Sequence, residues 1–168
     1  MVKYLVIFTL MDKDTMLTLQ VGVQTMSLGR PLKNSLLAAA KMGADAVEID
    51  ARTELRGEVQ SQTAIRQFRK LLEDLNLKIA AISYPTRRGY DVIDRLDERI
   101  AGTKEAMQLA SALGAPVVVN CVGHVPSSMD VEEDEQERKR WNFLCDVLGE
   151  LGHFGDRLGT VLAAETGN

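Results

Sequence analysis

Short apolar runs of strand type alternate along this chain with longer segments whose apolar residues recur at helical spacing. This alternation is the signature of strand–helix units around a parallel sheet, so it predicts an α/β fold. The five predicted strands cover residues 19–26, 46–50, 78–83, 117–120 and 160–164.

Four helices are predicted between these strands, each with its apolar residues on one face. The first follows Pro31 and Asn34 and ends at Gly43, because glycine accepts the left-handed conformation needed just past a helix. Ser61 is a suitable N-cap for the second helix, and Gly114 ends the third. The residues expected to face the core are Leu36, Leu37 and Ala40, then Ile65, Phe68, Leu72 and Leu75, then Leu96, Ile100, Met107 and Ala110, and finally Trp141, Leu144, Leu148 and Leu151.

Residues 1–18 precede the first predicted strand and are treated as a separate N-terminal extension. Their apolar segment, residues 2–10, is far shorter than the ~20 residues needed to cross a bilayer. Residues 4–8 are aromatic and β-branched, which favours an extra strand before the polar turn at residues 12–14. The alternative is an extension that is disordered or packs against the outside of the domain.

Composition favours one domain over residues 19–168, because a chain of 168 residues with 45% hydrophobic residues can bury a single core. The net charge is -4 and the basic residues are scattered among acidic ones, which argues against a phosphate backbone as partner. Cys121 and Cys145 lack zinc-ligand spacing and indicate reduced thiols of a cytoplasmic protein. We therefore expect neither nucleic acid nor a membrane as a partner.

Three stretches of the chain have a distinctive order and spacing. Residues 38–49 form a helix–glycine–strand pattern that closes on Glu48, residues 79–83 are followed by residues 110–119, and residues 162–167 read Leu-Ala-Ala-Glu-Thr-Gly. Together they resemble the xylose isomerase-like superfamily of sugar isomerases and epimerases, whose members are parallel (β/α) barrels. The resemblance covers residues 19–168.

The resemblance implies a parallel (β/α) TIM-barrel type of fold that is truncated. A closed barrel of this type needs eight strand–helix units and typically ~250 residues, whereas this chain holds about five units. The expected fold is therefore a partial barrel with a possible extra N-terminal strand. Because the loops after the strands build the active sites of such barrels, functional residues are sought there.

Glu165 is the residue to which the resemblance assigns chemistry. The family carries a metal-binding glutamate at this position, and in the epimerase branch it also moves a proton next to a carbonyl. The implied cofactor is a divalent metal, Mn²⁺ or Mg²⁺ or else Zn²⁺, and such ions need several oxygen or imidazole ligands. The family supplies the others, an aspartate, a histidine and a second glutamate, from strands six to eight, which this chain lacks. The alternative interpretation of Glu165 is a solvated carboxylate at a frayed end.

Four further residues are candidates for binding a sugar or sugar phosphate. Glu48 stands at a position the family prefers and could hydrogen-bond a substrate; its alternative is a buried structural carboxylate paired with Arg52. His124 follows the fourth strand, where it could contact a hydroxyl or phosphate. Arg87 and Arg88 lie in the loop after the third strand, and their guanidinium groups suit anionic oxygens. The alternatives for these three are a solvated histidine and two exposed arginines.

Two features argue against other kinds of metal site. The acidic run at residues 130–137 lacks the glycine and ligand spacing of a calcium loop, so it predicts a solvated helix start. The AP endonuclease branch of the superfamily has a metal-binding histidine at the end of strand four, where this chain has Cys121. A trinuclear zinc nuclease site is therefore disfavoured.

The leading functional hypothesis is a sugar or sugar-phosphate isomerase/epimerase that uses a divalent metal and is incomplete in this chain. The alternative is a non-catalytic binding or assembly module derived from such a barrel, and an AP endonuclease-like activity ranks third. Five strands leave unpaired edges and uncovered apolar faces, so we also expect a homo-oligomer.

Overall fold

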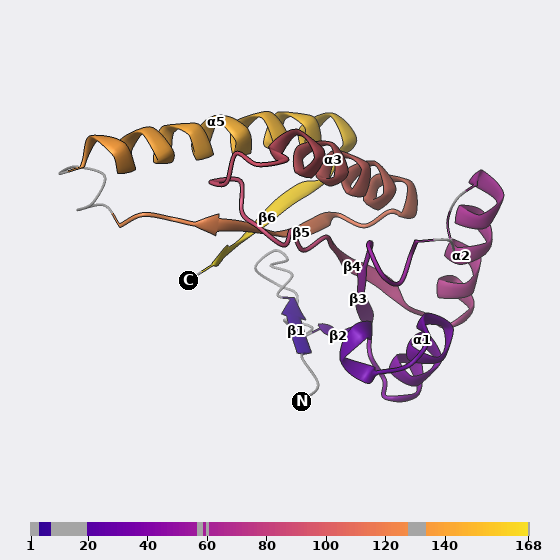
Figure 1. Ribbon diagram of the computed structural model, residues 1–168. Helices are drawn as coiled ribbons and strands as arrows, with labels where there is room; N and C mark the ends of the chain where they lie inside the picture. The colour runs from indigo at the N-terminus through magenta and orange to yellow at the C-terminus, as the bar shows by residue number, and fades with distance from the viewer. Residues whose placement is uncertain (1–3, 8–19, 57–58, 60, 128–133, 168) are drawn as a thin grey trace, which may run out of the picture. The chain divides into compact units, whose positions relative to one another are not determined.

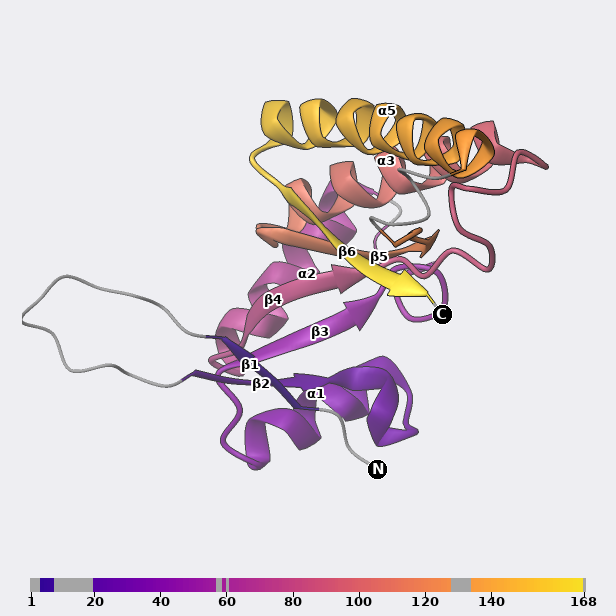
Figure 2. The same ribbon diagram turned by 90° about the vertical axis from the view of Figure 1, so that its left-hand side faces the viewer.

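The computed structural model describes residues 4–7, 20–56, 59, 61–127 and 134–167. The chain divides into two compact units, one of residues 1–83 with 112–115 and the other of residues 84–111 with 116–168. Figure 1 and Figure 2 label the strands and helices of both units.

Among the described residues, the first unit is a sheet of four strands. β2 pairs with β3 and β3 with β4 in parallel, whereas β1 pairs with β2 in antiparallel direction. The elements in chain order are β1 (Tyr4–Ile7), β2 (Gln20–Gln24), the 3-10 helix η1 (Thr25–Leu28), α1 (Leu32–Lys41), β3 (Ala46–Asp50), α2 (Gln62–Asp74) and β4 (Lys78–Ser83).

The central strand of this unit is β3, and all five of its residues are buried. Burial along the whole strand is typical of parallel sheets that are covered on both faces. The helix α2 begins where Ser61 Oγ accepts a hydrogen bond from the Ala64 amide at 3.1 Å, and it buries Phe68 and Leu72. Gly43 follows α1 with a φ of 77°, which a residue with a side chain rarely adopts.

The second unit contains two parallel strands and two long helices among the described residues. The elements are α3 (Leu96–Leu113), β5 (Val117–His124), α5 (Glu135–Leu158) and β6 (Val161–Gly167). The register of the strands is continuous from Val117 opposite Val161 to Cys121 opposite Glu165, and it shifts between Cys121 and Gly123. Both views show α3 and α5 running over one face of β5 and β6 (Figures 1 and 2).

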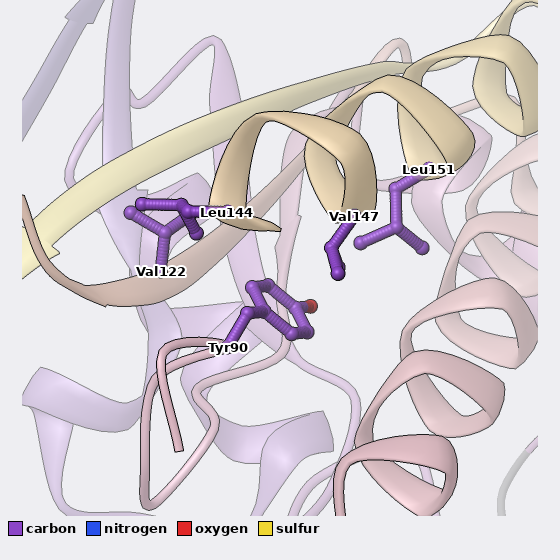
Figure 3. Packing of buried hydrophobic residues seen from close by; sticks show 5 residues of the cluster. All are labelled: Tyr90, Val122, Leu144, Val147 and Leu151. Atoms are coloured by element: carbon purple, nitrogen blue, oxygen red, sulfur yellow. The ribbon is translucent and has the colours of Figure 1, made fainter. Parts of the chain in front are cut away.

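A buried cluster fixes these helices to that face of the strands. Tyr90 from the loop before α3 and Val122 of β5 pack with Leu144, Val147 and Leu151 of α5 (Figure 3). Partly buried residues that complete the cluster are Leu96, Ile100, Val125, Leu148 and Leu162. Burying a side chain of this size stabilises the fold by about 1.5–3 kcal/mol, so the cluster accounts for much of the cohesion of the unit.

The predicted alternation of strands and helices is confirmed, with three parallel strands in the first unit and two in the second. The predicted strands 46–50 and 78–83 have the observed bounds. Residue 19, where the first predicted strand begins, lies outside the described residues. That strand ends at Gln24 rather than at residue 26, because Thr25 begins η1, and β5 and β6 extend to His124 and Gly167.

Two residues predicted to face the core are instead exposed. Trp141 is 36% exposed and Leu37 is 39% exposed. Each lies on the flank of a helix whose buried stripe is formed by its neighbours, Leu144 in α5 and Leu36 in α1. Within the described parts of the chain, no helix is long and apolar enough to cross a membrane.

Candidate functional site

Glu48 stands near the carboxyl end of β3 and is held by the neighbouring strand. It is 9% exposed, and its Oε1 accepts a hydrogen bond of 2.9 Å from Nε2 of Gln24. Gln24 is also its register partner on β2, so the two side chains share one face of the sheet. The result is a carboxylate of fixed orientation at the end of a parallel strand, where ligands of α/β proteins commonly bind.

A second carboxylate, that of Glu54, lies beside the end of the same strand. Glu54 Oε2 is 2.6 Å from the hydroxyl of Thr25 and accepts the Asp50 amide at 3.0 Å. The Thr25 hydroxyl, which is fully buried, is also 2.9 Å from the Glu48 carbonyl oxygen. Sequence reasoning missed this contact, because Thr25 and Glu54 are 29 residues apart and no motif links them.

Asp50 organises the loop after β3. Its Oδ1 accepts hydrogen bonds from the amides of Arg52 at 2.9 Å and Thr53 at 2.7 Å, and from the Thr53 hydroxyl at 2.8 Å. An aspartate that bonds amides two and three residues ahead closes a turn. Asp50 therefore shapes the backbone that presents Glu54, and it is itself only 3% exposed.

In the second unit, Glu165 lies on the face of the strands opposite the helices. Leu162 of β6 packs in the cluster under α5, and side chains alternate between faces along a strand, so Glu165 points to the other face. Its register partner on β5 is Cys121, which has the same orientation. Glu165 is exposed and Cys121 is half-buried.

His124 is the last residue of β5 and is exposed. Its register partner is Gly167, two residues beyond Glu165 on β6. Because the two strands are parallel, His124 and Glu165 both lie toward the carboxyl ends of their strands. This is the end of the unit at which the sequence placed functional residues.

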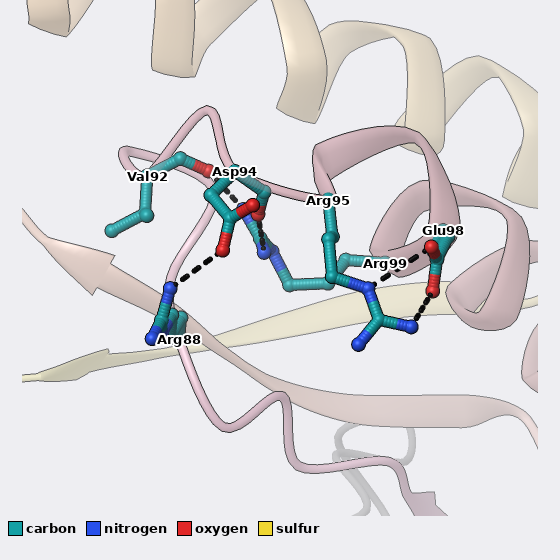
Figure 4. A network of polar contacts seen from close by, with 6 residues as sticks. All are labelled: Arg88, Val92, Asp94, Arg95, Glu98 and Arg99. Atoms are coloured by element: carbon teal, nitrogen blue, oxygen red, sulfur yellow. Dashed lines mark hydrogen bonds and ion pairs between the residues drawn. The ribbon is translucent and has the colours of Figure 1, made fainter.

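The loop before α3 carries both candidate arginines. Arg88 Nη1 is 2.8 Å from Asp94 Oδ2 in an exposed ion pair (Figure 4). Arg87 is also exposed. The guanidinium of Arg99 donates to the carbonyl oxygens of Val92 and Asp94, so the loop is closed on the first turns of α3. This ion pair orients the Arg88 guanidinium, which carries further N–H donors besides those of Nη1.

An ion pair at the start of α3 lies next to this loop. Arg95 donates from Nη2 to Glu98 Oε2 at 2.5 Å, and this bond holds the pKa of the Glu98 carboxyl below its usual range. Both groups are fully exposed, so the pair adds little to stability.

Tyr90 is a core residue rather than part of an arginine-lined surface. It is fully buried, and its hydroxyl lies 2.6 Å from Thr103 Oγ1. Thr103 donates its single hydrogen to the Arg99 carbonyl at 2.9 Å and accepts Asn120 Nδ2 at 3.1 Å, so Tyr90 is the donor in the pair. Burial raises the pKa of the Tyr90 phenol above its usual value.

The same network ties the loop to β5. Thr86 donates its hydroxyl to the Cys121 carbonyl at 2.5 Å, and the Tyr90 amide donates to the Val122 carbonyl at 2.9 Å. These bonds fix the start of the arginine-bearing loop against the strand that carries Cys121 and His124. The loop is thus anchored at its base, while Arg87 and Arg88 project from it.

The described residues do not complete a divalent metal site. They contain no group of three or more His, Cys, Asp and Glu side chains that could hold an ion. A divalent cation needs at least four ligands, and Mg²⁺ about six. Glu165 can therefore act as one ligand, and the rest of a coordination shell would have to come from groups other than those described.

Comparison with known proteins places this fold in a known family. The family described as xylose isomerase-like TIM barrel matches residues 36–168. Comparison with curated proteins finds no match.

Several solved structures share the fold. A xylose isomerase domain protein from Planctomyces limnophilus has a TM-score of 0.64 at 19% identity, over 79% of this chain and 49% of that one. D-psicose 3-epimerase with D-tagatose, from Clostridium cellulolyticum H10, has a TM-score of 0.61 at 13% identity, over 79% and 46%. A xylose isomerase-like TIM barrel protein from Mycobacterium smegmatis in complex with magnesium has a TM-score of 0.56 at 19% identity, over 83% and 46%.

The chain spans about half the length of each of these three structures. Its parallel strands alternate with helices in the order of the barrel, and the family match covers well over half of its residues. The chain therefore belongs to the xylose isomerase-like TIM barrel family.

Proposed function

We propose that this chain carries the N-terminal strand–helix units of a sugar or sugar-phosphate isomerase/epimerase that uses a divalent metal. In this proposal Glu165 is one of the metal ligands and also transfers a proton next to the substrate carbonyl. The observation that carries it is the position of Glu165, which is exposed toward the carboxyl end of β6 on the face without helices. A carboxylate that must reach a substrate proton needs this accessibility.

Four residues are proposed for substrate contacts, each considered at its own strand end or loop. Glu48, whose Oε1 is held by Gln24, would accept a hydrogen bond from a sugar hydroxyl. His124 would contact a hydroxyl or phosphate at the end of β5, and Arg87 and Arg88 would meet a phosphate group. Arginine suits this role because its planar fork of donors matches phosphate oxygens. The epimerase structure solved with D-tagatose is consistent with a sugar as the substrate class.

A second proposal is a non-catalytic binding or assembly module. It is favoured by one observation, the absence of a three-ligand group among the residues that the structure describes. The net charge of -4 and the presence of Cys121 both weigh against the third candidate, an AP endonuclease-like activity.

Calorimetric titration of the chain with Mn²⁺ separates these proposals. The isomerase/epimerase proposal predicts that Mn²⁺ binds through Glu165, with an affinity limited by the ligands that the described residues lack, and that Glu165→Gln abolishes this binding. Glu105→Gln is the matched control, because Glu105 is an exposed carboxylate on α3 of the same unit. No heat of binding in the unaltered chain would favour the binding module, and binding that survives Glu165→Gln would remove Glu165 from the proposed site.

A further inference from the structure

The outer edge of β2 is paired with an antiparallel strand. In a closed ring of parallel strands, each strand has a parallel neighbour on both sides. β2 has a parallel neighbour on one side only, with Gly22 opposite Ala46 on β3. On its other side lies the antiparallel strand β1, with Tyr4 opposite Val23 and Ile7 opposite Gln20. A parallel strand can pair with this edge only after β1 has left it.

The sequence of β2 reads the same in both directions. Its five residues are Gln20-Val21-Gly22-Val23-Gln24. If two copies met antiparallel about a two-fold axis at Gly22, Val21 of one copy would face Val23 of the other, and Gln20 would face Gln24. Such an interface is isologous, with each residue meeting its counterpart on the same face of the sheet. The edge is therefore self-complementary in the antiparallel direction, which is also the direction that β1 uses.

We propose that the β2 edge is a docking surface for a second copy of this chain, and that β1 occupies it in the single chain. Open strand edges pair readily with other chains, and proteins commonly cover them. β1 and β2 belong to one chain, so their pairing is intramolecular and is favoured over pairing with a second chain at low protein concentration. In this proposal β1 therefore outcompetes a second β2 until it is released.

Two proline variants test the proposal. Successive amides of an edge strand point alternately toward its partner and away from it, so Leu5→Pro and Val6→Pro form a matched pair. One of them removes a hydrogen bond to β2, and the other falls at an outward amide, where proline is tolerated. Sedimentation velocity over a range of concentrations measures association. Hydrogen exchange measures the protection of the Gln20 and Gly22 amides, which face β1, because the intervening Val21 directs its amide and carbonyl to Asp45 on the β3 side.

The proposal predicts that one of the two variants dimerises several-fold more than the unaltered chain. In that dimer the Gln20 and Gly22 amides regain protection, because the second β2 replaces β1. The other variant should match the unaltered chain. A third variant, Val6→Cys combined with Val21→Cys, joins register partners of β1 and β2. Its oxidised form should not exceed the unaltered chain in dimer content.

Three results would overturn the proposal. The first is that neither proline variant changes association. The second is that a variant exposes the β2 amides without forming a dimer, which would show that the freed edge does not dock a second copy. The third is a dimer, or a larger assembly, in which the β2 amides stay unprotected, since the contact would then lie elsewhere. Retention of the far-ultraviolet circular dichroism of the unaltered chain ensures that the comparison is made on folded protein.

Discussion

Cys121 and Glu165 are register partners on the parallel strands β5 and β6, and their side chains stand side by side on the face that α3 and α5 leave uncovered. The same face carries Val161, which is 65% exposed, at the start of β6. A closed barrel buries this face in its interior. In the second unit it instead presents a carboxylate and a thiol next to each other.

Replacement of Thr103 should destabilise the protein more than replacement of Tyr90. Thr103→Val keeps the shape but leaves the Tyr90 hydroxyl and the Asn120 amide without their buried acceptor, at a cost of roughly 2–4 kcal/mol. Tyr90→Phe removes a single donor and should cost about 1 kcal/mol. Urea unfolding of both variants measures the difference. A Thr103→Val variant as stable as Tyr90→Phe would mean that Thr103 is not the hub of the network.

Stability should fall at alkaline pH because of Tyr90. Burial raises the pKa of its phenol in the folded state above the unfolded value of about 10. The folded protein therefore holds a proton that the unfolded chain releases, so the stabilisation is complete below about pH 10 and is lost as the pH rises through the folded pKa. Urea midpoints measured across this range should decline less steeply for Tyr90→Phe. Equal slopes for the two proteins would contradict the assignment.

Two glycines of the second unit should respond oppositely to alanine. A Cβ on Gly123 would lie 2.6 Å from the Gly89 Cα, at a φ of 96°, so Gly123→Ala should destabilise by roughly 2 kcal/mol or more. A Cβ on Gly149 meets nothing within 4 Å in the helix α5, so Gly149→Ala should stabilise by about 0.5–1 kcal/mol. Thermal unfolding of the pair provides the measurement. Loss of stability in both variants would mean that the surface of α5 at Gly149 has no room for a methyl group.

The regular parts of the fold were predictable from local patterns. Ser61 as an N-cap and Gly43 and Gly114 at helix ends are confirmed, the two glycines each having a φ of 77°. These features depend on residues within a few positions of one another. The exposed Trp141 was mispredicted, because helical spacing identifies an apolar face but not its edge, and Trp141 lies just outside the buried stripe of α5.

The polar contacts around the candidate site could not be predicted. One hydrogen bond joins Thr25 to Glu54, which are 29 positions apart, and another joins Tyr90 to Thr103, which are 13 positions apart. The geometry of both bonds depends on how strands and loops pack. The antiparallel pairing of β1 with β2 likewise depends on tertiary packing. A strand pattern in the sequence predicts a strand but does not indicate which other strand it pairs with. Glu165 was singled out from the order of three sequence stretches, and its role as a ligand remains a proposal.

Disulfide trapping tests the position of Glu165 most directly. Register partners on neighbouring strands have Cα atoms about 4.8 Å apart, within the range a disulfide spans. Glu165→Cys should therefore link to Cys121 under mild oxidation, as peptide mapping would detect, whereas Ala164→Cys, on the opposite face, should not. A link formed from position 164 but not from position 165 would place the carboxylate under the helices and contradict the proposed site.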